Sequence, residues 1–195
     1  GYVVSVVRER PTFVEAEVKR AADAVIVQWA HDSAYRFFPL VQSDVFGLTL
    51  HPFDLATNKV LALVGRVEAR DWVDAMCCAE RIQPLGYLAW AACGKDLGFS
   101  PASILEHAAR SARYSSAELS GLAFEGQAPD GAALAALWRS QLEEARDVID
   151  RLPPEESGRC VLGPGNALYK GAPAAVRDDL AAGMVVFHSG RIRGA

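Results

Sequence analysis

The sequence predicts an α+β protein: a small, mostly antiparallel sheet comes first, a helical bundle follows, and a Gly- and Pro-rich tail ends the chain. Up to about residue 50, apolar residues alternate or form short β-branched runs, and after Pro52 they recur at helical spacing. Hydrophobic residues make up 51% and charged residues 23% of the 195 positions, which is typical of folded globular proteins and excludes a wholly disordered chain.

The first part of the chain is expected to be a sheet. The predicted strands are residues 2–7, 12–19 and 24–29. Short links between them favour antiparallel pairing of neighbours, and the alternation in the second strand places Glu15 and Glu17 on one face. Residues 30–51 are predicted to form a loop followed by one more short strand at about 46–51.

From Asp54 onward the pattern predicts helices, with Asp54 at the N-cap of the first and Gly65 at its end. The predicted helices are residues 54–65, 68–81, 84–97, 101–113, 115–122 and 131–152. Pro153 and Pro154 end the last of them, and the tail is expected to form a short-stranded appendage. The expected domains are therefore residues 1–80 (sheet portion), 81–152 (helical domain) and 153–195 (C-terminal appendage).

Composition narrows the classes of function. The net charge of −4 argues against broad binding to duplex phosphates. No apolar run approaches the ~20 residues that cross a bilayer, so no membrane partner is expected. The four cysteines form no C-x-x-C pair and the four histidines have no metal-ligand spacing, which predicts reduced thiols, a cytoplasmic location and no zinc site. Because the chain begins with Gly and enters a strand at once, we expect a processed product or a piece of a longer chain.

One stretch concentrates charged residues around a predicted junction of two helices. Lys59 and Arg66 are seven residues apart and share a helix face, and Asp71 and Asp74 share a face of the next helix, which also carries Arg70. Opposite charges are therefore predicted to converge at a corner. A salt-bridge network that only sets the angle of this corner would give the same pattern.

The order of these residues resembles the third and fourth motifs of the AbiEii/AbiGii-type nucleotidyltransferases of the polymerase-β superfamily. The matching positions are Asp54-Leu55-Ala56, Lys59, Ala62-Leu63, Arg66, Arg70-Asp71 and Asp74. The resemblance extends more loosely over about residues 1–150, so the sheet would be the remnant of a catalytic palm. It implies magnesium-dependent transfer of a nucleoside monophosphate from an NTP to an RNA or protein acceptor, as in toxin–antitoxin systems. It assigns nucleotide binding to Lys59, Arg66 and Arg70, and catalytic roles to Asp71 and Asp74.

The sequence departs from this family at the expected metal ligands. The family's D-x-D motif is absent from these 195 residues, and Gln28 stands where a third carboxylate is expected. An amide cannot act as a general base, and Asp32 is the nearest substitute. Glu15 and Glu17 are interpreted as part of an exposed sheet face. The sequence therefore assigns no magnesium ligands. Two explanations fit: the D-x-D segment lies upstream of these residues, or the protein is a degenerate member of the family.

Three hypotheses of function follow. The first is a nucleotidyltransferase-like protein whose D-x-D segment is missing. The second is a catalytically degenerate member that binds a partner protein, as an antitoxin-type or regulatory module would. The third is an α+β domain whose charged corner is architectural. Since two-metal chemistry needs converging carboxylates, this chain alone is predicted to be inactive and to bind NTP weakly.

Overall fold

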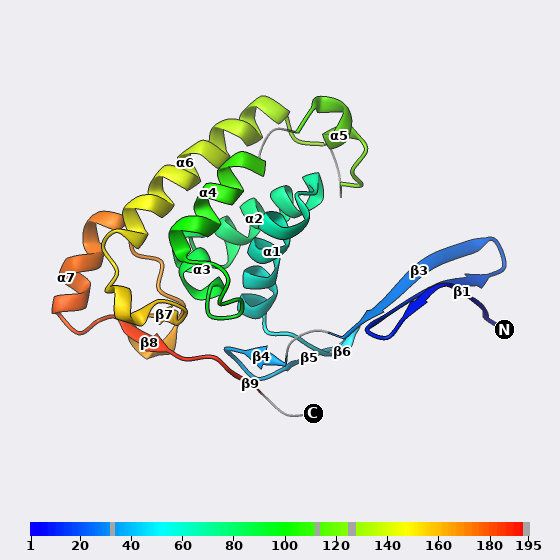
Figure 1. Ribbon diagram of the computed structural model, residues 1–195, viewed down its shortest axis with the longest axis horizontal. Helices are drawn as coiled ribbons and strands as arrows, with labels where there is room; N and C mark the ends of the chain where they lie inside the picture. Colours follow the sequence, from blue (N-terminus) through cyan, green and yellow to red (C-terminus); the bar gives the residue numbers. More distant parts are fainter. Residues whose placement is uncertain (32–33, 112–113, 125–127, 193–195) are drawn as a thin grey trace. The chain divides into compact units, whose positions relative to one another are not determined.

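The computed structural model describes residues 1–31, 34–111, 114–124 and 128–192 (Figure 1). Contacts within the chain divide it into two compact units, which hold Gly1–Ala34 and Tyr35–Arg193. The first unit is a sheet, and the second contains all the helices of the described residues. The predicted α+β class, with a small antiparallel sheet ahead of a helical region, is confirmed.

The first unit is a three-stranded antiparallel meander. Its strands are β1 (Val3–Arg10), β2 (Phe13–Arg20) and β3 (Asp23–Ala30), with β2 in the middle. β1 continues three residues beyond the predicted end because Arg8, Glu9 and Arg10 still pair with β2, after a shift in register between Val6 and Arg8. The prediction of antiparallel strands within residues 2–30 is confirmed.

The second unit is mainly helical. Its helices are α1 (Pro52–Arg66), α2 (Ala69–Arg81), α3 (Leu85–Ala92), α4 (Pro101–Ser111), α5 (Ser116–Ser120), α6 (Gly131–Ile149) and α7 (Val176–Ala181). All eight residues of α3 are buried, because α1, α2, α4, α6 and the strand β7 described below pack around it. A Cβ on Gly86 would lie 2.7 Å from the Cβ of Val148, so the glycine allows α3 and α6 to approach closely.

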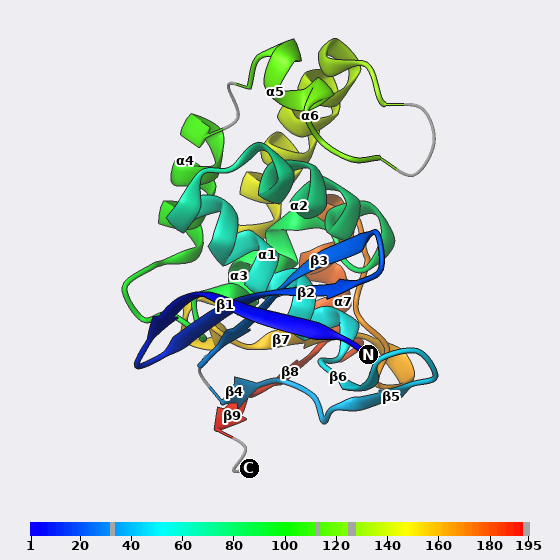
Figure 2. The same ribbon diagram turned by 90° about the vertical axis from the view of Figure 1, so that its right-hand side faces the viewer.

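The long helix α6 organises this unit. Figure 1 shows α6 lying along α4 and α3, with α7 and the strands β7 (Cys160–Leu162) and β8 (Val186–His188) near its C-terminal end. Figure 2 shows α5 close to the first turn of α6, where Leu119 faces Gly131. Asp130 caps α6, and Ser115 with Glu118 forms a capping box at the start of α5. No strand lies among the described residues of 84–150, as predicted.

Several predicted helix ends are wrong by a few residues. Asp54 is not the N-cap of α1: the cap is His51, whose Nδ1 accepts from the N–H of Phe53 at 3.2 Å, and Pro52 begins the helix. Gly65 does not end α1, which continues to Arg66 and closes at Val67 with a left-handed φ of 57°. The third and last helices end at Ala92 and Ile149 rather than at 97 and 152.

Short strands complete the second unit. β5 (Val41–Ser43) pairs with β6 (Gly47–Thr49), which is the short strand predicted near residues 46–51. β4 (Tyr35–Arg36) pairs with β9 (Arg191–Ile192), and β7 (Cys160–Leu162) pairs with β8 (Val186–His188). β4 and β5 fall in the stretch predicted as loop, where two- or three-residue strands leave no periodic pattern.

The tail is part of the helical unit rather than an appendage to it. All three residues of β7 are buried, and buried side chains of the region before and within α3 hold the tail backbone. The amide nitrogen of Gln83 donates to the carbonyls of Val161 at 2.9 Å and Tyr169 at 2.7 Å. The indole N–H of Trp90 donates to the carbonyl of Glu156 at 2.9 Å.

The domain boundaries expected at residues 80 and 152 therefore differ from the observed division at residue 34. α1 and α2 pack against α3 in one core, so a boundary at residue 80 would cut through continuous helix packing. Among the described residues, no helix has both the length and the apolar character needed to span a membrane.

Candidate functional site: the corner between α1 and α2

The apolar faces of α1 and α2 fix the corner at which the predicted charged residues meet. α1 buries a stripe that includes Phe53, Val60 and Leu63, and α2 buries Trp72 and Met76. The two stripes pack into the same core, so the polar residues beside them are brought onto one rim. The left-handed residue at the end of α1 turns the chain directly into α2.

The predicted ion pairs are present in the structure. The Nζ atom of Lys59 lies 2.6 Å from Oδ2 of Asp74 and 3.5 Å from Oδ1 of Asp71. A guanidinium nitrogen of Arg66 donates to the same Oδ1 of Asp71 at 3.1 Å. Both aspartates and two of the three predicted cations therefore form one network, which confirms the expected convergence.

Burial differs sharply across this network. The side chain of Asp71 is fully buried, whereas those of Lys59 and Arg66 are 38% and 53% exposed and that of Asp74 is 45% exposed. A buried anion attracts cations more strongly than an exposed one, because less water screens its charge. Asp71 therefore fixes two cations at the protein surface, where a ligand can reach them.

Arg70 lies outside this network. Its Nε atom is 2.8 Å from Oε2 of Glu68, and both side chains are about half exposed. The prediction that Arg70 would act together with Lys59 and Arg66 is not supported by the observed pairing. Because Arg70 precedes Asp71 on α2, its side chain leaves the helix in a different direction.

Asp71 has one oxygen with partners and one without. Oδ1 receives both cations, while Oδ2 is buried and has no hydrogen-bond partner among the described residues. The Tyr114 hydroxyl and the Trp72 indole N–H are also buried and have no hydrogen-bond partner in the described part of the chain, and their rings lie 5.3 Å apart between centroids. Burial, together with the nearby charge of Asp71, raises the pKa of Tyr114 to about 12.

The cysteine beside the network is not an activated nucleophile. Burial and the charge of Asp74 raise the pKa of Cys78 to about 11, although Lys59 acts in the opposite direction. The thiol therefore stays protonated at neutral pH. All four cysteines are free, in keeping with the prediction of reduced thiols.

The carboxylates of the first unit are occupied by neighbouring side chains. Glu15 lies 3.7 Å from Arg8 and accepts from the amide of Gln28 at 2.5 Å, and Glu17 pairs with Lys19 at 2.8 Å. Both carboxylates belong to a face of the sheet, as predicted, but this face is not fully exposed: the side chains of Glu15 and Glu17 are only 12% and 31% exposed. Asp32, the suggested substitute acid, lies outside the described residues.

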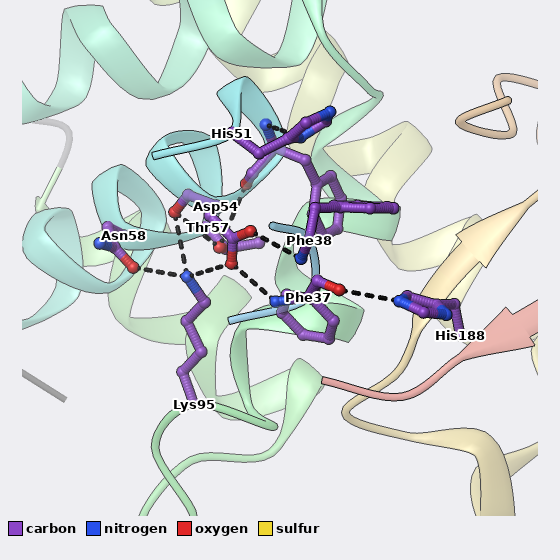
Figure 3. Close-up of polar contacts among 9 residues, drawn as sticks. Phe37, Phe38, His51, Asp54, Thr57, Asn58, Lys95 and His188 are labelled. Carbon is purple, nitrogen blue, oxygen red and sulfur yellow. Dashed lines mark hydrogen bonds and ion pairs between the residues drawn. The ribbon is translucent and has the colours of Figure 1, made fainter. Parts of the chain in front are cut away.

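A second polar cluster, centred on Asp54, was missed by sequence reasoning (Figure 3). Asp54 is fully buried and accepts from the backbone N–H groups of Phe37 at 2.9 Å and Phe38 at 3.0 Å. Lys95, whose side chain is only 7% exposed, lies 2.9 Å from Oδ1 of Asp54 and donates to Asn58 at 2.8 Å. This cluster ties the segment before β5, the start of α1 and the turn after α3 together.

Two histidines flank the same cluster. The rings of His51 and His188 lie 4.4 and 5.2 Å from the ring of Phe38, between centroids, and Nε2 of His188 is 2.8 Å from the carbonyl of Phe37 (Figure 3). Burial lowers the pKa of His51 below its ordinary value. The two residues are 137 positions apart in the sequence, so no spacing pattern could have joined them.

The described residues do not assemble a magnesium site. Among them, no three His, Cys, Asp or Glu side chains converge as metal ligands. At the corner, the Lys59 ammonium lies between Asp71 and Asp74, where a divalent cation would need both carboxylates. The donor set present here therefore does not fit the magnesium ion that the family resemblance implies.

Comparisons with known proteins give no relatives. No protein-family model matches the chain, and neither the curated proteins nor the solved structures contain a match.

Proposed function

We propose that the corner between α1 and α2 binds the phosphate groups of a nucleotide, and that the protein is nucleotidyltransferase-like. Together with the metal-binding carboxylates that the family resemblance implies, it would transfer a nucleoside monophosphate from an NTP to an RNA or protein acceptor. The observation that supports this most is that two half-exposed cations, Lys59 and Arg66, are held on one oxygen of the buried Asp71.

The arrangement suits a phosphate group for two reasons. An ammonium is a compact point charge, and a guanidinium offers five N–H donors, so together they match an anion with several acceptor oxygens. The contact of Lys59 with the exposed Asp74 is an ion pair of the kind worth only ~0–1 kcal/mol, so a phosphate can displace it. The buried Asp71 then keeps Lys59 and Arg66 in place.

The roles proposed for the aspartates are positional. Asp71 holds both cations, and Asp74 orients Lys59 when no ligand is bound. Because the residues at the corner do not form a magnesium site, no step through the metal is assigned to them. The transfer chemistry would need carboxylates that the described residues do not bring together.

One observation favours the second candidate function, a catalytically degenerate member that binds a partner protein as an antitoxin-type or regulatory module. Gln28 occupies the position of the expected acid, and its amide is engaged by Glu15 on the face of the sheet. A glutamine that donates to a neighbouring carboxylate is part of a polar ladder, and its neutral amide cannot act as a general base.

The test measures NTP binding and transfer by the chain as it stands. We expect weak, salt-sensitive binding with little dependence on magnesium, and no measurable labelling of RNA or protein by labelled NTP. Lys59→Ala should weaken binding about fivefold, the upper range for an exposed charge contact. Arg70→Ala is the matched control, because Arg70 lies at the same corner but pairs with Glu68, and it should change binding less than twofold by the same reasoning.

Two outcomes would contradict the proposal. If the wild-type chain does not bind NTP, or if Lys59→Ala and Arg70→Ala weaken binding equally, the corner is architectural and the nucleotide-binding proposal fails. Robust labelling that Lys59→Ala abolishes would show that the chain is active alone. Glu15, Glu17 or Asp32 would then have to supply the missing metal site.

A further inference from the structure

One face of the three-stranded sheet is apolar from edge to edge. Residues opposite one another in neighbouring strands share a face, so the pairing register defines which side chains lie together. The apolar face, as we name it, consists of Val4, Val6, Val14, Ala16, Val18, Val25, Val27 and Trp29. This face therefore carries only apolar side chains over most of its length.

The opposite face is mixed: it holds Val3, Phe13 and Ile26, but its central rows are polar and supply their own partners. These rows carry the ion pair of Arg8 with Glu15, the hydrogen bond from Gln28 to Glu15, and the pair of Lys19 with Glu17. A face whose charged groups are already paired gains little by binding another protein. Any surface that stabilises this sheet by covering it is therefore expected on the apolar face.

The first unit by itself leaves its apolar face exposed. Val4, Val6, Val25 and Trp29 are 59%, 61%, 56% and 53% exposed, and only the central Ala16 is fully covered. Single exposed apolar residues are normal, but a contiguous patch of this kind marks an interaction surface. A small sheet also needs packing on its apolar face to be stable.

We propose that a second copy of this chain covers the apolar face, through the same face of its own sheet. A two-fold symmetric contact requires a surface that is compatible with itself, and this face has no charge in its centre that would repel its copy. Charges lie only at its ends: Glu9 is in the row of Trp29, and Arg20 and Asp23 form the row at the other end. In an antiparallel arrangement, Glu9 of each copy meets the end that carries the oppositely charged pair Arg20 and Asp23 of its partner, and the two Glu9 carboxylates stay apart.

The size of the face sets the expected strength. Eight residues at ~3.3 Å and three strands at ~4.8 Å give a face of about 26 by 14 Å. Two such faces have a flat area of about 730 Å² in total, below the ~1,000 Å² of a stable specific interface, so the contact belongs to the weak, transient class. The dimer should therefore dissociate on dilution through the micromolar range.

Two neighbouring residues give a matched pair of variants. Val25 and Ile26 are consecutive in β3 and are 56% and 53% exposed, but they lie on opposite faces of the sheet. In sedimentation velocity of the full chain over a concentration series, the wild type and Ile26→Asp should show the same monomer–dimer equilibrium. Val25→Asp should weaken dimerisation at least about tenfold, because it buries a charge in the interface. Far-UV circular dichroism checks that both variants fold.

A second measurement does not depend on a charged variant. Trp29 lies on the apolar face, so the tryptophan emission of the wild type should shift to shorter wavelength as the dimer forms, and Trp29→Phe should lose this shift. A chain that stays monomeric at every concentration, or equal effects of Val25→Asp and Ile26→Asp, would overturn the proposal. A monomer in which Trp29 is shielded would also overturn it, because the face would then be covered by something other than a second copy.

Discussion

Asp54 and Asp71 are both fully buried carboxylates of the helical unit, and both hold cations, but their surroundings differ. Both oxygens of Asp54 have partners, namely two backbone N–H groups and Lys95, which is itself buried. Within the part of the chain that the structure describes, one oxygen of Asp71 has partners, the half-exposed Lys59 and Arg66, and the other has none. The first cluster is closed, and the second opens to solvent through its cations.

This difference separates architecture from a candidate binding site. In the Asp54 cluster, every charge is matched inside the protein, so a ligand has no unoccupied group to bind. In the Asp71 cluster, the cations keep part of their hydration and most of their donors, so an anion can replace water there. The same residue type, buried to the same degree, therefore forms a closed cluster in one place and a solvent-facing cluster in the other.

The comparison is tested first by removing the charge from Asp54. Asp54→Asn should lower the free energy of unfolding by about 3–5 kcal/mol, because it leaves the buried Lys95 without its carboxylate. Urea unfolding at neutral pH measures this. Asp44→Asn, at the exposed turn between β5 and β6, is the control and should lie within about 0.5 kcal/mol of wild type. A loss below about 1 kcal/mol for Asp54→Asn would contradict an architectural role.

The same substitution at the corner should have a smaller effect on stability. Asp71→Asn should cost about 1 kcal/mol, because Lys59 and Arg66 can return to solvent and the unpartnered oxygen is replaced. It should weaken NTP binding at least as much as Lys59→Ala, since both cations lose their anchor. A loss of stability equal to that of Asp54→Asn would show that the corner is as closed as the other cluster.

The corner was accessible to sequence reasoning because its residues are close in the chain. Lys59, Arg66, Asp71 and Asp74 lie on two consecutive helices, and helical spacing alone predicts which of them share a face. The burial of Asp71 was not predictable in this way, because a charged residue in an amphipathic helix indicates the solvent side. The switch from sheet to helix near Pro52 was predictable for a related reason, since each periodicity is local.

The Asp54 cluster could not be predicted, because it joins residues that are distant in the chain. Lys95 follows Asp54 by 41 positions and lies in a turn beyond α3, where no periodicity applies. Asp54 was instead interpreted as a helix cap, which is a common role for aspartate before an apolar run. Its backbone partners, Phe37 and Phe38, are separated from it by the hairpin of β5 and β6. The strands of this hairpin are too short to show a periodic pattern of apolar residues.

The cap of α1 is the third test, and it depends on pH. Nδ1 of His51 accepts from the N–H of Phe53, which a protonated imidazole cannot do, and burial lowers the pKa of His51 below 6.5. On acidification, the unfolded state therefore takes up the His51 proton at a higher pH than the folded state does. The stability that the His51 cap contributes is present above pH 6.5 and is lost as the pH falls through the lower pKa of the folded state. His51→Ala should cost about 1 kcal/mol at pH 7.5.

His51→Asn isolates the titration, because asparagine caps a helix without changing charge. Thermal unfolding between pH 5 and 7.5 should show a steeper loss of stability on acidification for the wild type than for His51→Asn. Equal slopes would mean that His51 does not contribute to the pH dependence.

The smallest effect is expected at Tyr114, which lies beside Asp71. Its hydroxyl is buried without a hydrogen-bond partner among the described residues, so Tyr114→Phe removes an unsatisfied group and should change stability by less than about 0.5 kcal/mol. Tyr169→Phe is the matched control: the Tyr169 hydroxyl donates to Asp179, and its loss should cost about 1 kcal/mol.

Burial raises the pKa of both phenols to about 12. The unfolded chain, with an ordinary value of 10.0, therefore loses these protons first, and stability should fall as the pH rises from 10 to 12. Each Phe variant should show a shallower fall than the wild type in urea unfolding over this range. If Tyr114→Phe is more costly than Tyr169→Phe at neutral pH, the Tyr114 hydroxyl has a partner in solution. Oδ2 of Asp71 would then be the first candidate for it, and the corner would be more closed than the comparison with Asp54 implies.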